Sequence, residues 1–231
     1  GSLLHLEDDL RGGPRYVMLA TIRAFALEQL TRAGDEDETR QRHAAYWVAF
    51  VEQGYPNHFG PATGIDRRLQ QLEKELPNLR AALAFMAEAG NADGVLRLAG
   101  ALAVFCQLRS HLHEGRQWLE WALAHTVEVQ TDARCRALVG FGLIRWAQGE
   151  YEQAAPLVHA ALAIADQIGD TEIVAHAIHV LGLIEERQQR WEQAELLLEQ
   201  ALGLWRALGA QEQLLEVVAG IVLAQALQAL P

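Results

Sequence analysis

Apolar residues recur at helical spacing along most of the chain, and downstream of residue 130 the pattern repeats itself. Residues 149–154 (GEYEQA) align with residues 189–194 (QRWEQA) at an offset of 40, and Gly142 aligns with Gly182 at the same offset. A weaker copy lies upstream at an offset of 39. Self-similarity at a fixed period of this size indicates an array of stacked helical or β units.

Each copy predicts two antiparallel helices. In the clearest copy, helical spacing predicts helices over 132–148 and 151–168. A turn separates them at 148–150, and Gly169 is the expected C-cap of the second helix. A fourth copy starts near residue 211 and has no second helix, and the chain stops after an apolar run without a polar cap. We therefore expect an array truncated at its C-terminus, cut from a longer protein.

Small residues recur where two helices of one copy must approach each other. Gly142, Ala154 and Ala161 have small counterparts in the next copy, while the bulky Tyr151 and Trp191 are expected to fill the wedge near the turn. This pattern resembles the tetratricopeptide repeat, although the period of 39–40 exceeds the usual 34 by about one turn per helix. Armadillo and HEAT repeats share a period of about 40 but do not predict these small residues, and they remain the second interpretation.

The first ninety residues do not follow the repeat. Residues 3–8 and 15–19 read as two short strands joined by a turn-rich link. The following pattern predicts four helices, over 20–32, 37–53, 65–75 and 78–89, with a break at Pro77 and Asn78. The predicted fold is therefore all-α, a right-handed superhelix of tetratricopeptide type preceded by a short β-hairpin.

Composition and charge limit the partners. The 231 residues are 51% hydrophobic, and 19 Lys and Arg face 30 Asp and Glu, for a net charge of −11. This balance argues against direct nucleic-acid binding, which needs clustered basic side chains. No apolar run approaches the roughly 18 residues of a membrane span, and no secretory signal is visible. The two cysteines cannot form a disulfide framework, so we expect a cytoplasmic protein.

Motifs for catalysis are missing from the sequence. There is no phosphate loop, the sole Gly-x-Gly (residues 140–142) lies inside a predicted helix, and only two serines occur. We expect no enzyme activity and no cofactor in this segment. His176 and His179 could share a helix face as metal ligands, but a third ligand is missing, and exposed groove positions are the favoured interpretation. The acidic residues 35–38 are interpreted as a solvated helix start rather than a cation site.

The tetratricopeptide register places defined positions of each first helix on a concave face. A groove of this kind suits an extended peptide or a small anionic effector, with arginine as the clamp. A merely solvated inner face is the alternative. The expected groove residues are Arg97, Gly100, Val104 and Gln107 in the first copy, Arg136, Val139, Leu143 and Trp146 in the second, and His176, His179, Leu183, Glu186 and the adjacent Arg187 in the third.

Four stretches resemble bacterial STAND-class regulators, the signal-transduction ATPases with numerous domains. They are, in the family's order, residues 15–30 (RYVMLATIRAFALEQL), 42–46 (RHAAY), 72–83 (LEKELPNLRAAL) and 113–119 (HEGRQWL). Pro77 departs from the acidic residue typical of that position. The resemblance implies an upstream nucleotide-binding domain, which would hold ATP and magnesium, then a winged helix and a tetratricopeptide-type sensor. Many members carry a LuxR-type DNA-binding domain and regulate transcription.

The same resemblance implies three parts and a function. Residues 1–33 would be the remnant of the winged helix, 34–90 a helical connector and 91–231 the repeats. The segment would then be the sensor of a transcriptional regulator, with an effector or peptide in the groove and the ATPase domain of the same polypeptide as partners. A freestanding tetratricopeptide adaptor is the alternative, but it leaves the stretch 15–30 unexplained.

Overall fold

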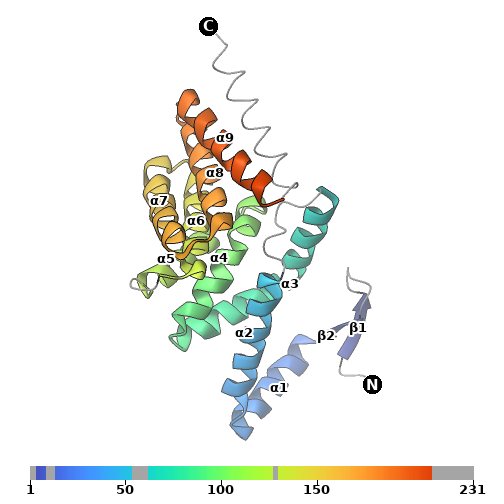
Figure 1. Cartoon of the computed structure of the whole chain (residues 1–231). Coiled ribbons are helices and arrows are strands. Elements are labelled where there is room, and N and C mark those ends of the chain that lie inside the picture. Colours follow the sequence, from blue (N-terminus) through green and yellow to red (C-terminus); the bar gives the residue numbers. More distant parts are fainter. Residues whose placement is uncertain (1–3, 9–13, 54–61, 127–129, 210–231) are drawn as a thin grey trace.

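The computed structural model describes residues 4–8, 14–53, 62–126 and 130–209. Strands β1 (Leu4–Asp8) and β2 (Pro14–Met18) pair antiparallel, with Leu4 opposite Met18. Helices occupy almost all of the remaining described chain (Figure 1). They are α1 (Ala20–Ala33), α2 (Glu36–Glu52), α3 (Ala62–Glu88), α4 (Ala92–Leu108), α5 (Leu112–Ala124), α6 (Asp132–Ala147), α7 (Tyr151–Ile168), α8 (Thr171–Arg187) and α9 (Trp191–Ala207).

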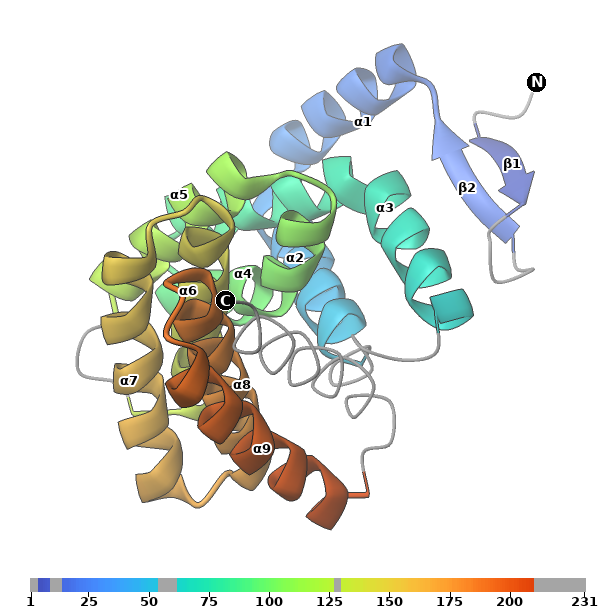
Figure 2. The same cartoon turned by 90° about the horizontal axis from the view of Figure 1, so that it is seen from above.

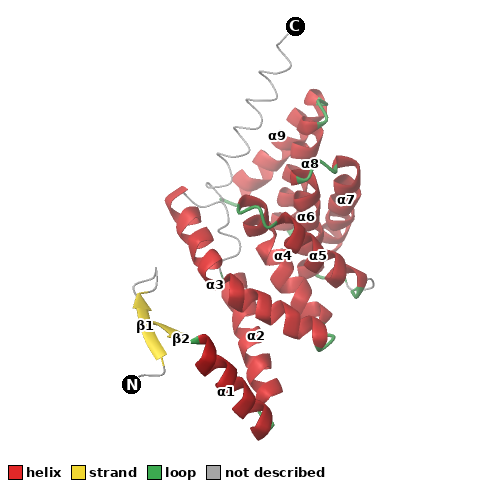
Figure 3. Cartoon of the chain, turned by 180° about the vertical axis from the view of Figure 1, so that it is seen from behind, coloured by secondary structure: helices red, strands yellow, loops and turns green. Residues whose placement is uncertain are grey.

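The helices form hairpins that stack side by side. Helices α4 and α5, α6 and α7, and α8 and α9 are the three pairs, and α2 and α3 pack against α4 ahead of them (Figures 1 and 3). One hydrophobic core runs from Ala44 on α2 to Ile184 on α8, and a smaller cluster around Leu198 and Trp205 joins α8 to α9. The predicted fourth copy, from about residue 211, lies outside the described residues. None of the helices in the described ranges meets the length and hydropathy of a membrane-spanning segment.

Small residues bring the two helices of a hairpin together as predicted. Ala154 and Ala161 on α7 are fully buried. A Cβ atom added to Gly142 on α6 would lie 2.4 Å from Cγ2 of Val158, and one added to Gly182 on α8 would lie 2.8 Å from Leu198. Real Cβ atoms do not approach other atoms so closely, so only glycine fits these positions without movement.

The turns inside the hairpins share one geometry. Ser110, Gly149 and Gln189 occupy equivalent positions, and all three have a left-handed backbone with φ between 62° and 79°. In each case the next residue donates its N–H to the carbonyl five residues earlier, as Glu150 does to Arg145 at 2.9 Å. This hydrogen bond closes a helix end around a left-handed residue. The repeat therefore extends from sequence to backbone, even where the residue is not glycine.

The predicted helix break at Pro77 is wrong, because α3 continues from Ala62 to Glu88. Proline in a helix removes one hydrogen bond and costs about 3 kcal/mol. Burial offsets this cost: Leu72, Leu76 and Leu79 on either side of Pro77 are at most 8% exposed. The buried face of α3 is continuous across the proline, so packing overrides the local signal.

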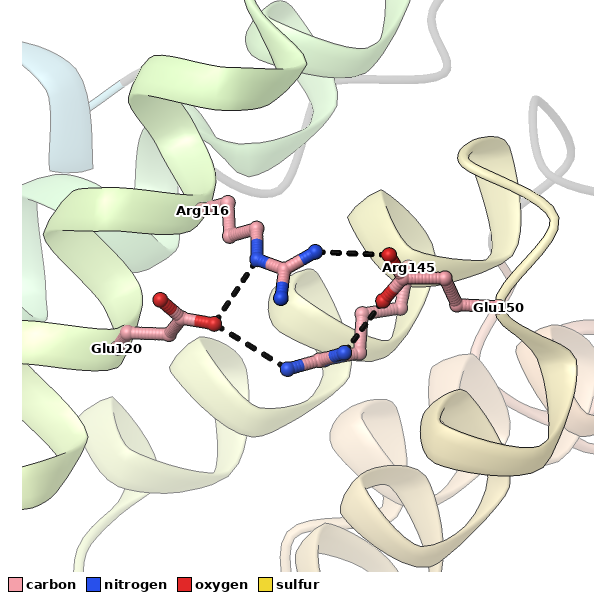
Figure 4. Close-up of polar contacts among 4 residues, drawn as sticks. All are labelled: Arg116, Glu120, Arg145 and Glu150. Atoms are coloured by element: carbon pink, nitrogen blue, oxygen red, sulfur yellow. Dashed lines mark hydrogen bonds and ion pairs between the residues drawn. The ribbon is translucent and has the colours of Figure 1, made fainter.

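Charged side chains add a ring that ties the first hairpin to the second. Arg116 and Glu120 on α5 alternate with Arg145 on α6 and Glu150 at the start of α7 (Figure 4). Arg116 lies 2.8 Å from Glu150 and 2.9 Å from Glu120, while Arg145 lies 3.2 Å from Glu120 and also pairs with Glu150. Exposure to solvent weakens each of these pairs, but a closed network fixes the orientation of the side chains.

Candidate functional site

Helices α4, α6 and α8 carry the predicted groove positions and pack against one another in this order, and the middle of the expected inner face is closed. Val104, Val139, Leu143 and His179 were expected to line a groove, and they are only 6%, 1%, 7% and 4% exposed. Gly100 is buried as well. An open groove along the full inner face is therefore not present in the described part of the chain, and this part of the prediction is wrong.

Close approach of α4 and α6 is the physical reason. A Cβ atom added to Gly100 would lie 3.1 Å from the backbone nitrogen of Ala137, and one added to Gly140 would lie 2.5 Å from Cβ of Ala103. Two glycines and two alanines thus let the helix backbones touch. Side chains at mid-length of the helices then belong to the hydrophobic core rather than to a binding surface.

His176 and His179 on α8 are not the exposed groove residues that we expected. His176 is half-buried, and Nε2 of the buried His179 has no hydrogen-bond partner among the described residues. Burial lowers the pKa of His176 to about 4; burial, together with neighbouring His176, lowers the pKa of His179 to about 3. Both imidazoles are therefore neutral at pH 7. In the described ranges, no cluster of three or more His, Cys, Asp or Glu could hold a metal ion.

The C-terminal ends of α6 and α8 carry a second group of predicted residues. The indole Nε1 of Trp146 donates to the carbonyl oxygen of Leu183 at 3.1 Å, and the guanidinium of Arg187 lies 5.3 Å from the Trp146 ring centroid. Glu186 is buried, which raises the pKa of its carboxyl, against the opposing effect of Arg187. Trp146 therefore joins two repeats. Gln107, at the corresponding end of α4, is half-buried.

A charged cleft remains open at the N-terminal ends of the inner helices. It encloses about 480 Å³ and holds Arg97 and Arg136, two of the predicted residues. Arg97 Nε donates to Glu52 of α2 at 2.7 Å, and Arg136 pairs with Asp132 at 2.9 Å. The hydrogen bond with Glu52 is the main cause that raises the pKa of Arg97. Both guanidinium groups are thus already neutralised by the protein.

Two more carboxylates make the cleft acidic. Asp93 of α4 and Glu172 of α8 also line it, and neither forms an ion pair with any of the described residues. Burial is the first cause that raises the pKa of Glu172, followed by the nearby Asp170, with Arg136 opposing. Four carboxylates and two guanidinium groups leave a surplus of two negative charges. An anionic ligand clamped by arginine, as expected from the sequence, does not suit this balance.

The acidic residues of the cleft were not predicted from the sequence, although they recur with the period of the repeat. Asp93, Asp132 and Glu172 occupy the first turns of α4, α6 and α8 at offsets of 39 and 40. Each precedes by four residues a predicted groove residue: Arg97, Arg136 or His176. Opposite charges at this spacing lie on one helix face. A search for paired positions, rather than for single groove positions, would have found them.

Comparisons with known proteins agree with the repeat. Residues 133–207 match the family model for the tetratricopeptide repeat. Over 188 residues, 78% of this chain, the sequence is 33% identical to proteins described as HTH-type transcriptional regulators in Mycobacterium tuberculosis and Mycobacterium bovis. The chain spans about a fifth (21%) of the length of these relatives. It is thus a tetratricopeptide-repeat region with distant homology to one part of larger regulators.

A solved structure supports the same fold. The crystal structure of TPR-like repeats described as those of a kinesin light chain from Podosopora anserina superposes with a TM-score of 0.51. The alignment covers 84% of this chain and 99% of that one, at 15% identity. Identity this low shows the arrangement of helix hairpins and nothing of the ligand.

Proposed function

We propose that this chain is the sensor and protein-interaction region of a STAND-class transcriptional regulator. The observation that carries the proposal is the 188-residue similarity to HTH-type regulators, which includes stretches on both sides of the start of the repeats. A freestanding adaptor needs only the repeats and gives no reason for similarity outside residues 133–207.

The charged cleft is the proposed binding site. Its surplus of two negative charges favours a partner segment that presents a lysine or arginine between Asp93 and Glu172. The pairs Arg97–Glu52 and Arg136–Asp132 hold two of the four carboxylates in place and leave Asp93 and Glu172 for the partner.

Binding at this place can be transmitted because the cleft joins four helices. Glu52 belongs to α2, Asp93 to α4, Asp132 to α6 and Glu172 to α8. A ligand that prefers one spacing of these helices shifts the population towards that arrangement of the stack. In the proposed mechanism this shift changes the contact of the repeats with an upstream ATPase domain and releases autoinhibition.

A genetic experiment tests the proposal. Asp93→Asn with Glu172→Gln removes the surplus charge, while Glu192→Gln with Glu199→Gln makes the same change of net charge on α9, outside the cleft. We expect the first double variant of the full-length protein to alter genome-wide transcript levels at unchanged protein abundance, and the second to match wild type. The proposal is contradicted if both strains are indistinguishable from wild type while deletion of the gene changes transcription. The gene is also expected to encode a phosphate loop upstream of this region.

A further inference from the structure

Helix α1 is unusual in this structure because none of its residues is buried. Phe25 on α1 is 60% exposed, and Leu19, just before it, is 54% exposed. With 14 residues, such a helix is marginal in water without an apolar face packed against a neighbour. In Figures 1 and 2, α1 and the β1–β2 hairpin project from the stack of helices. This end of the molecule therefore presents an apolar face that the described residues leave uncovered.

The uncovered face borders a cleft of about 660 Å³ between β2, α1, α2 and α3. Its lining is mainly apolar, with Met18 from β2, Leu27 and Leu30 from α1, and Ala81 and Phe85 from α3. Unlike the charged cleft, it lies outside the repeats. Three helices form its walls, so a further helix would complete a four-helix packing around the apolar lining.

The rim of the cleft is basic although the chain as a whole carries a net charge of −11. Arg23, Arg40 and Lys74 line it, and among the described lining residues Glu88 supplies the one carboxylate. Arg40 also pairs with Glu36 at 2.6 Å, and Lys74 has an interaction partner as well. Arg23 also lines the cleft, and it forms no ion pair with a described residue. The local charge favours an acidic partner.

A chain of hydrogen bonds holds the floor of the cleft. Trp47 Nε1 donates to His43 Nε2 at 2.8 Å, and because an indole only donates, the proton of the neutral imidazole lies on Nδ1. His43 also hydrogen-bonds to Asn78, and Asn78 Nδ2 donates to Glu75 at 2.7 Å. Burial lowers the pKa of His43, which keeps it neutral. The floor is therefore ordered before any ligand arrives.

Three of the four stretches that resemble the STAND regulators meet at this cleft. Residues 15–30 contribute Tyr16, Met18 and Arg23, residues 42–46 contribute His43, and residues 72–83 contribute Lys74 and Asn78. These stretches are distant in sequence and converge only in the folded chain.

We propose that this cleft docks an amphipathic helix of a partner protein, whose apolar stripe is flanked by acidic side chains. The apolar stripe would cover Leu27, Leu30 and Phe85, and the acidic flank would pair with Arg23. A helix in a groove is an established mode of recognition, with anchors at positions i, i+3, i+4 and i+7.

Two synthetic peptides test this assignment. Both span about five helical turns and share the same leucine and alanine stripe, and they differ in carrying either glutamates or lysines on the flanks. We expect fluorescence anisotropy with the whole chain at low salt to give at least about tenfold tighter binding of the glutamate peptide. Arg23→Glu should reverse the preference. Arg42→Glu is the matched control, because Arg42 is 71% exposed and does not line the cleft.

Several results would overturn the proposal. They are equal affinity for the two peptides, no binding of either at millimolar concentration, or an unchanged preference in Arg23→Glu. Binding of a small amphiphile such as dodecanoate without binding of the peptide would equally exclude a helix as occupant. Far-UV circular dichroism checks that Arg23→Glu is folded. If it is not, Arg23→Ala takes its place and should remove the preference instead of reversing it.

Discussion

Gly142 offers a direct test of how closely the hairpins pack. In Gly142→Ala the new methyl group would lie 2.4 Å from Cγ2 of Val158, which is itself fully buried. Valine has a stiff χ1 angle, so it cannot turn away easily. Overpacking costs about 1–3 kcal/mol, while alanine gains about 1 kcal/mol in helix propensity. We expect a net loss of up to about 2 kcal/mol in the free energy of unfolding.

Gly203→Ala is the matched control. Gly203 lies within α9, and a Cβ atom there would meet nothing within 4 Å. The same substitution should therefore increase stability by about 1 kcal/mol. Urea unfolding, followed by both tryptophan fluorescence and far-UV circular dichroism, measures both changes. Coincident transitions are required, because repeat arrays can unfold in steps.

A second substitution tests the cause. Val158→Ala alone should destabilise by about 2–3 kcal/mol, because it removes two buried methyl groups. Combined with Gly142→Ala, it removes the clash and leaves space for the new methyl. The double variant should therefore be about 1–2 kcal/mol more stable than the sum of the single effects predicts. Stabilisation by Gly142→Ala alone, equal to that of Gly203→Ala, would refute the close approach.

Three further predictions concern turns, protonation and thiols. Gln189→Gly should stabilise the folded chain by about 1 kcal/mol, because glycine adopts the left-handed backbone at this position without strain. Gly149→Gln should destabilise it by a similar amount, and the midpoints of urea unfolding measure both changes. The folded-state pKa values of His176 and His179, about 4 and 3, lie below the ordinary 6.5. The two neutral histidines therefore contribute fully to the free energy of unfolding above pH 6.5. This contribution is lost as the pH falls towards 4, by up to about 1.4 kcal/mol per pH unit for each histidine. Replacing both by Gln should flatten stability between pH 7 and 5, and an equally steep decline would contradict this. Burial raises the pKa of Cys106 to about 12, so iodoacetamide at pH 8 should label it only in urea; rapid labelling of the folded chain would contradict this.

Local sequence was sufficient to predict the hairpins. The period and the small residues are set by contacts within one hairpin, which recur whenever a glycine on one helix faces alanines on the next. Gly142, Ala154 and Ala161 therefore have the packing that the pattern indicates. The left-handed turns at Ser110 and Gln189 escaped prediction because neither residue type marks that conformation.

Packing between hairpins was the harder part. The burial of Val139 and His179 depends on how closely α4, α6 and α8 approach one another. The repeat register assigns residues to the faces of one helix, but it does not predict the distance between helices. The predicted helix break at Pro77 was wrong for a related reason, because the long buried face of α3 outweighs the local effect of the proline. The acidic side of the charged cleft was missed because groove positions were considered singly.

Titration calorimetry at the charged cleft tests the central claim most directly. The probes are penta-lysine and penta-glutamate, titrated at low salt into the wild-type chain and into Asp93→Asn with Glu172→Gln. We predict that penta-lysine binds and penta-glutamate does not, and that the double variant binds penta-lysine about tenfold more weakly, since two charges near a partly exposed site contribute about 1–2 kcal/mol. The Glu192→Gln with Glu199→Gln control should keep wild-type affinity. Tighter binding of penta-glutamate, or equal affinity of penta-lysine for both double variants, would contradict the account.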